Sequence, residues 1–155
     1  MAKAPAPTEH AIQAAYIEWV RIAQNRHVAL NLLYAIPNGA AVARVKDPRT
    51  GEWSSGHKQA SKLLREGLLP GILDIHLPVP GRGTGADPRL CIGLWIEFKR
   101  PGGTMSTDQL RISGLLREFG HRVELCTTTE GAIDVTEDYL GVPPEERTRY
   151  FGTGD

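Results

Sequence analysis

The sequence has 155 residues, of which 41% are hydrophobic and 23% are charged. A chain of this length can bury one sizeable core and is too short for two ordinary domains, and its composition argues against general disorder. It lacks the run of about 18 uncharged apolar residues that would span a membrane, and its first ten residues lack the apolar stretch of a secretory signal. We therefore expect a cytoplasmic protein with one domain over residues 8–142, between tails at 1–7 and 143–155.

The formal net charge is zero, but the charges are unevenly distributed along the chain. Residues 21–69 hold eight Arg or Lys against three Asp or Glu, whereas residues 118–155 hold nine acids against three bases. A basic half could follow a phosphate backbone while an acidic half faces solvent or a partner. Ordinary surface charge is the alternative. Cys91 and Cys126 lie far apart in apolar surroundings, which favours buried free thiols over a disulfide or a metal site.

The first part of the chain predicts a tail, a helix and a strand. Ala and Pro alternate in residues 1–7, and Thr8 can cap a helix that ends near residues 25–27. The apolar side of this helix recurs at three- and four-residue spacing: Ile12, Ala15, Tyr16, Trp19, Val20 and Ala23. The apolar run 28–36, stopped by Pro37-Asn38-Gly39, predicts a buried strand.

Residues 40–56 are irregular by composition, and a short helix is expected over residues 57–66, ended by Gly67. Strands are expected over 72–77 and 91–98, joined by a hairpin loop at 81–89. Ser106 or Thr107 can cap a helix ended by Gly120, whose apolar side would be Leu110, Ile112, Leu115, Leu116 and Phe119. A strand over 123–126 and a helix through about residue 140 complete the chain.

The connections between these elements predict a mixed α/β domain. The strands 72–77 and 91–98 are joined without a helix and should be antiparallel neighbours. The strands 91–98 and 123–126 are joined through a helix, which implies a parallel pair.

The strand Leu94 to Lys99 carries residues that could take part in catalysis. Side chains alternate along a strand, so Glu97 and Lys99 share one face while Ile96 and Phe98 point to the other. Burying charges on such an apolar strand is costly unless they are paired or bound to a metal. If the strand of Asp74 pairs with this one, Asp74 and Glu97 come together. A surface Glu-x-Lys pair with an unrelated Asp is the alternative, since Glu-x-Lys alone is a weak signal.

Two carboxylates forced together repel each other unless a divalent cation lies between them. Their hard oxygen ligands suit Mg²⁺ or Mn²⁺, which can polarise a phosphoryl oxygen and lower the pKa of a bound water. Lys99 could orient the attacking water or stabilise charge that develops on the phosphate. In outline this is a site for phosphodiester hydrolysis.

The ordered motifs resemble the VRR-NUC family of the PD-(D/E)xK nuclease superfamily, from about Thr8 to Val123. They are Glu9 at the head of the first helix, Ile36-Pro37-Asn38-Gly39, Glu66 to Asp74, Ile96-Glu97-Phe98-Lys99, and Gly103 to Ser106 leading to Gln109. The resemblance implies a single compact α/β domain with a restriction-endonuclease-like mixed sheet flanked by helices. One position departs from the family pattern, because Leu73 stands where a proline usually precedes the motif aspartate.

The resemblance also implies the roles of the site residues. The catalytic set is Asp74, Glu97, Lys99 and Gln109, and the ligands of Mg²⁺ or Mn²⁺ are Glu9, Asp74, Glu97 and the backbone carbonyl of Phe98. Glu9 could instead simply favour the helix dipole, and Gln109 could be an ordinary exposed glutamine.

Other polar residues are candidates for DNA contact. Lys58, Lys62 and Arg65 have the spacing of one helix face, which fits phosphate contact or a plain solvated face. Arg44 and Lys46 fall in a predicted DNA-contacting hairpin, and the remaining candidate is Asn38. His57, His76 and His121 show no metal-ligand spacing.

The favoured interpretation is a Mg²⁺- or Mn²⁺-dependent DNA endonuclease, directed to branched DNA in the manner of a four-way-junction resolvase and acting as a homodimer. Family members of this size look like phage-type or mobile-element proteins, which would place the protein in a bacterial host. A nicking or flap-type nuclease is the close alternative. A non-catalytic DNA-binding module with the same fold, or a small oligomeric structural protein, would leave the buried charges unexplained.

Overall fold

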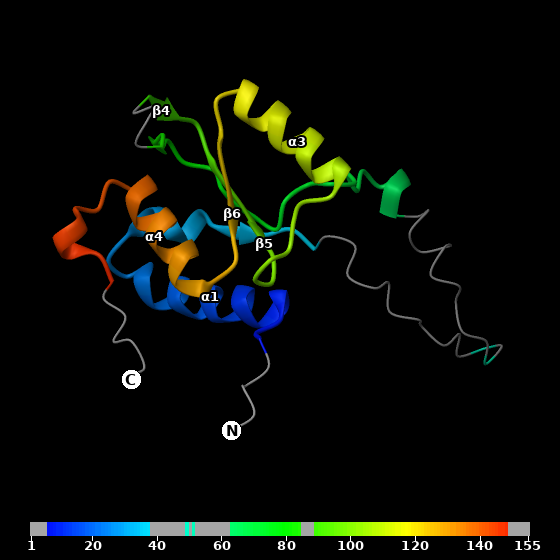
Figure 1. The fold of residues 1–155 in the computed structure, drawn as a ribbon, viewed down its shortest axis with the longest axis horizontal. Coiled ribbons are helices and arrows are strands. Elements are labelled where there is room, and N and C mark those ends of the chain that lie inside the picture. Colours follow the sequence, from blue (N-terminus) through cyan, green and yellow to red (C-terminus); the bar gives the residue numbers. More distant parts are fainter. Residues whose placement is uncertain (1–5, 38–48, 50, 52–62, 85–88, 149–155) are drawn as a thin grey trace.

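The computed structural model describes residues 6–37, 49, 51, 63–84 and 89–148 (Figure 1). In chain order the elements are helix α1 (Glu9–Ala23), a 3-10 helix η1 (Val28–Leu32), strands β1 (Tyr34–Ala35), β2 (Ile75–Leu77), β3 (Gly81–Arg82), β4 (Leu90–Cys91) and β5 (Leu94–Phe98), helix α3 (Thr107–Glu118), strand β6 (Arg122–Cys126), helix α4 (Thr129–Tyr139) and a 3-10 helix η2 (Pro144–Glu146).

The main sheet has the strand order β1-β2-β5-β6. Strands β2 and β5 pair antiparallel, and β5 and β6 pair parallel across the α3 crossover, so both predicted strand relations are confirmed. Strand β1 adds an antiparallel edge next to β2, while β3 and β4 form a separate two-stranded ladder. The mixed α/β class is confirmed.

The two faces of the main sheet are covered by different helices (Figure 1). One face carries Ile75, Leu77, Ile96 and Phe98, which pack against α1 and α4 in the larger core. The other face carries Trp95 and Val123, which form a smaller cluster with Leu116 of α3 and with Leu73 and Met105. Alternation along β5 therefore sends neighbouring residues to different environments.

The predicted helix starts are confirmed by their caps. Thr8 caps α1, with its hydroxyl accepting a hydrogen bond from the Ala11 backbone N–H at 3.1 Å. Ser106, one of the two predicted candidates, caps α3, and Thr128 caps α4. Of the short helix predicted over 57–66, the described part is helical over residues 63–65, and a turn at Glu66 and Gly67 follows, with a φ of +99° at Gly67.

The prediction of a buried strand over residues 28–36 is wrong. Residues Val28–Leu32 form a 3-10 helix, and only Tyr34–Ala35 join the sheet, as an exposed edge. Leu30 alone of the 3-10 segment is buried, while Val28 and Leu32 are exposed. A continuous apolar run carries no periodicity, so it could not distinguish these conformations.

Two other strands are shorter than predicted. Strand β2 begins at Ile75, so Asp74 lies in a bend just before it, although the Asp74 carbonyl still accepts a hydrogen bond from the Ile36 N–H at 2.8 Å. The strand predicted over 91–98 is divided at Ile92 and Gly93 into β4 and β5, which belong to different sheets. The predicted hairpin loop correspondingly begins with β3.

The apolar side predicted for α3 is only partly buried. Ile112 is buried and Leu116 packs on the smaller cluster, but Leu110, Leu115 and Phe119 are exposed. Ser113 takes a buried position instead, with its hydroxyl 3.4 Å from the Met105 sulfur. A small polar residue fits where the helix lies close to the sheet.

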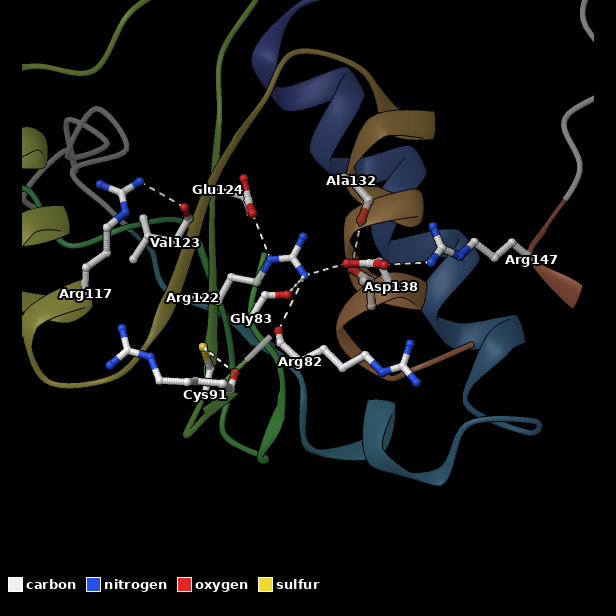
Figure 2. Close-up of polar contacts among 12 residues, drawn as sticks. Arg82, Gly83, Cys91, Arg117, Arg122, Val123, Glu124, Ala132, Asp138 and Arg147 are labelled. Atoms are coloured by element: carbon white, nitrogen blue, oxygen red, sulfur yellow. Dashed lines mark hydrogen bonds and ion pairs between the residues drawn. The ribbon is translucent and has the colours of Figure 1, made fainter. Parts of the chain in front are cut away.

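A charged network ties the C-terminal segment to the end of the sheet (Figure 2). Arg122 at the start of β6 is paired with Glu124 at 2.8 Å and with Asp138 of α4 at 2.7 Å. Asp138 also accepts from Arg147 at 2.7 Å. Residues 143–148 thus contact the domain directly, and Arg147 belongs to this network although the sequence placed it in a predicted tail.

Both cysteines are free, as predicted; Cys126 is buried in β6 and Cys91 is half-buried in β4. Burial raises the pKa of the Cys126 thiol to about 12. Within the described part of the chain, no helix has the length and hydrophobicity needed to cross a membrane.

Candidate active site

The register of β2 and β5 brings the two predicted acids together. Ile75 lies opposite Ile96, so one further step along the ladder places Asp74 opposite Glu97. The contact between the segments is direct, because the Phe98 backbone N–H donates to Asp74 Oδ2 at 2.8 Å. Both acids belong to the sheet face that α3 covers, since they alternate with Ile75 and Ile96 on the core face.

Glu97 is a buried carboxylate with an exposed fraction of 1%. Its Oε1 atom accepts hydrogen bonds from the Lys99 ammonium and from the side-chain amide of Gln109. Its Oε2 atom is also buried and has no hydrogen-bond partner among the described residues. An unsatisfied buried carboxylate oxygen is costly in a folded protein and calls for an explanation in each case.

Gln109 reaches Glu97 because of the way α3 begins. Ser106 and Gln109 form a capping box, in which Gln109 N donates to Ser106 Oγ at 3.2 Å and Ser106 N donates to Gln109 Oε1 at 2.9 Å. The amide oxygen of Gln109 is thereby committed to the cap, and its nitrogen faces Glu97. Ser106 was predicted only as a helix cap and not as a determinant of the site, although the pattern Ser-x-x-Gln before a helix signals it.

Lys99 follows β5 and lies between two carboxylates. Its ammonium is bonded to Glu97 Oε1 and lies 4.0 Å from Glu9 Oε2 at the start of α1. The Glu9 carboxylate also accepts a long hydrogen bond, 3.4 Å, from the Arg100 N–H. Glu9 is exposed, so this acid is at the rim of the group and not within it.

The electrostatics of Glu97 reflect these surroundings. Burial raises the pKa of Glu97 to about 7; the Lys99 hydrogen bond opposes this rise and the nearby charge of Asp74 adds to it. Burial by itself lowers the pKa of Lys99, but the hydrogen bond to Glu97 and the charges of Glu97, Glu9 and Asp74 raise it above its usual value. The predicted triad of Asp74, Glu97 and Lys99 therefore interacts as a group.

Comparison with known proteins identifies the fold. No family model matches the chain, and no curated protein does either. A solved structure described as a "VRR_NUC domain protein" matches with a TM-score of 0.62 and 17% identity, over 90% of this chain and 93% of that one. The chain has the VRR-NUC fold. The resemblance seen in the sequence motifs is confirmed at the level of the fold.

The oxygen donors in this VRR-NUC fold fit a hard divalent cation. Asp74 and Glu97 lie opposite each other, and the free Oε2 of Glu97 is an unused acceptor on the buried side of the site. Among the described residues, no three His, Cys, Asp or Glu side chains gather as an ion-binding group in this arrangement. Glu9 in particular is directed to Lys99 and Arg100.

A row of rings crosses the same sheet face of the VRR-NUC fold, next to the acids. His76 stacks on Trp95 with ring centroids 3.9 Å apart, and its Nδ1 lies 2.8 Å from the Tyr34 hydroxyl. Burial, with a smaller contribution from His121, lowers the pKa of His76 to about 4, so the ring is neutral near pH 7. His76 is therefore a hydrogen-bonded neighbour of the two acids.

Several predicted residues lie outside the described part of the structure. These are the candidate DNA contacts Asn38, Arg44, Lys46, Lys58 and Lys62, together with His57.

Proposed function

We propose that this chain is a Mg²⁺- or Mn²⁺-dependent deoxyribonuclease that hydrolyses phosphodiester bonds within DNA. The observation that carries the proposal is the placement of Asp74 opposite Glu97, with Lys99 bonded to Glu97 on the same face of the sheet. The similar solved structure, described as a VRR_NUC domain protein, supports a nuclease-like domain.

In this proposal Asp74, Glu97 and the Phe98 carbonyl hold the cation, and Glu9 completes the ligand set. The bound ion would supply a polarised phosphoryl oxygen and a water of lowered pKa. Gln109 keeps the Glu97 carboxylate oriented through its hydrogen bond, and its own orientation is set by the capping box. Lys99 stabilises the negative charge that develops on the phosphate or orients the attacking water.

The decisive experiment removes one acid at a time. Asp74→Ala and Glu97→Ala should each lower the cleavage rate by more than about 100-fold, since even residues that only support a metal ligand cost 10- to 100-fold. Asp134→Ala, which removes an exposed acid from α4, is the matched control and should cleave normally. The readout is cleavage of labelled linear duplex, flap and four-way-junction DNA with Mg²⁺, Mn²⁺ or EDTA, together with circular dichroism to check folding. Near-native cleavage by either variant with Mn²⁺ would refute the metal assignment.

The preferred substrate in this proposal is branched DNA, cut by a homodimer. Symmetric cleavage of a four-way junction requires two active sites related by a two-fold axis. A dimer would also double the phosphate contacts available to a chain with zero net charge. The interface would not use the apolar residues of α4 and its approach, because Tyr139 and Val142 are buried and Val135 and Leu140 pack against the core.

Light scattering of the protein alone and with junction DNA measures the assembly, and we expect a dimer in at least the bound state. A monomer in both states would exclude the resolvase assignment and leave the nuclease assignment standing.

Two other functions remain candidates within the same fold. A nicking or flap-type nuclease would cleave flap DNA faster than junction DNA in the same assay. A non-catalytic DNA-binding module would cleave none of the substrates, and the burial of Glu97 with an unpartnered oxygen argues against it.

A further inference from the structure

The ammonium of Lys99 lies beside two of the proposed metal ligands, Glu97 and Glu9. It is bonded to Glu97 Oε1, it lies 4.0 Å from Glu9 Oε2, and the charge of Asp74 also acts on it. Its side chain has an exposed fraction of only 15%. A single cationic group therefore pairs with two of the acids that the proposed function assigns to the metal, Glu97 and Glu9, and is also stabilised by the charge of the third, Asp74.

The ion pair between Lys99 and Glu97 opposes the binding of a divalent ion to the same carboxylate. Its Oε1 atom already accepts from both Lys99 and Gln109. A divalent cation bound to this carboxylate would lie close to the ammonium, and like charges at such a distance in a buried site repel strongly. Even if the ion uses the free Oε2 atom, each cation therefore disfavours the binding of the other at Glu97.

Lys99 and Gln109 differ in their freedom to move. Gln109 is held by the reciprocal capping-box hydrogen bonds to Ser106, so its contact with Glu97 is fixed by the start of α3. Lys99 has a long flexible stem, and its backbone is anchored independently, since its N–H donates to the Cys126 carbonyl at 3.0 Å. The ammonium can therefore leave Glu97 without disturbing β5 or β6.

We propose that the Lys99 ammonium takes the place of the cation in the metal-free protein and competes with Mg²⁺ or Mn²⁺ for the Glu97 carboxylate. The inference rests on the proposed function, because it takes Glu97 and Asp74 as the metal ligands. It assigns Lys99 a second role, in which it neutralises the buried acid before the metal enters. Removing the positive charge of Lys99 should therefore strengthen metal binding.

The test is calorimetric titration of the 155-residue chain with Mn²⁺, in the absence of DNA. Lys99→Met keeps the apolar stem and removes the charge, and it should bind Mn²⁺ about tenfold more tightly, within the usual range of coupling between two ligands. Lys99→Gln is a second neutral variant in case the methionine variant folds poorly, and it should behave in the same way. Lys99→Arg retains the charge and should bind no more tightly than wild type.

Arg100→Met is the matched control for the general loss of a positive charge. Arg100 is the next residue and is exposed, and its contact with Glu9 is made by the backbone N–H, which the substitution retains. Equal tightening in Arg100→Met and Lys99→Met would overturn the inference, because a long-range charge effect would then explain both. Unchanged or weaker Mn²⁺ binding by both neutral Lys99 variants would also overturn it.

The Glu97→Gln variant separates this inference from the proposed function. If Glu97→Gln loses Mn²⁺ binding while the neutral Lys99 variants show no tightening, the metal site stands and only the competition is wrong. If Glu97→Gln binds Mn²⁺ as wild type does, the ion binds elsewhere, and the proposed metal site fails together with the inference.

Discussion

The buried polar side chains on the two faces of the main sheet differ in how fully they are hydrogen-bonded. On the face covered by α1 and α4, the buried hydroxyls of Tyr16 and Thr136 bond each other at 2.7 Å, and the buried Glu137 accepts two hydrogen bonds from Thr148. On the face covered by α3, His76 Nε2 and Glu97 Oε2 are buried without a partner among the described residues. Unsatisfied groups therefore gather on one side of a single sheet.

This difference separates the parts of the molecule that stabilise it from those proposed to carry out chemistry. The α1–α4 face has the larger apolar core, and none of its buried side-chain polar atoms lacks a hydrogen-bond partner among the described residues, so it can offset the cost of the other face. The α3 face has a smaller apolar cluster and keeps two ionisable residues, Asp74 and Glu97, close together. Natural proteins tolerate such local conflicts chiefly at functional sites.

Removing a buried aromatic side chain from the α1–α4 face should destabilise the protein far more than removing one from the outer side of α3. Phe98 is 1% exposed and packs against Tyr16, with ring centroids 5.5 Å apart, whereas Phe119 at the end of α3 is 72% exposed. Phe98→Ala should lower the free energy of unfolding by about 3–5 kcal/mol because it leaves a cavity in the main core. Phe119→Ala, the matched control, should change it by less than about 0.5 kcal/mol.

Urea unfolding followed by circular dichroism measures both variants. A comparable loss of unfolding free energy in Phe119→Ala would show that the outer side of α3 is covered in solution. It would contradict the conclusion that the α1–α4 face contributes most of the stability.

The burial of Glu97 on the α3 face should make the stability of the protein depend on pH. The pKa of Glu97 is about 7 in the folded protein, above the ordinary value of 4.5, and burial is the main cause. The native state therefore binds this proton more tightly than the unfolded state. Ionised Glu97 costs stability above pH 7, and this cost disappears as the pH falls from 7 to 4.5.

The measurement is the unfolding free energy of wild type relative to Glu97→Gln, in EDTA, between pH 4 and 8, a window set by the two pKa values of Glu97. Wild type should gain stability relative to the variant as the pH falls through this window, with little further change below it. Parallel pH profiles for the two proteins would mean that Glu97 is not held in a desolvated site.

The sequence alone determined those features that depend on neighbouring residues. The caps Thr8 and Ser106 followed from the chemistry of unpaired N–H groups at helix starts, and the sharing of one face by Glu97 and Lys99 followed from strand alternation. The parallel and antiparallel strand relations followed from the lengths and types of their connections. Together with the ordered motifs, these local rules were sufficient to predict the fold and to select the acids of the candidate site.

Tertiary structure decided what depends on residues far apart in the chain. Residues 28–36 were predicted as a strand and instead form a 3-10 helix and a short edge, because an apolar run is compatible with either until its neighbours are known. The exposure of Leu110 and Phe119 on α3 depended on which side of the helix meets the sheet. Gln109 contacts Glu97 only because the first turn of α3 lies next to this residue of β5 and the helix cap orients the amide. Periodicity acts over a few residues, whereas burial and charge pairing are set by whichever distant element lies opposite.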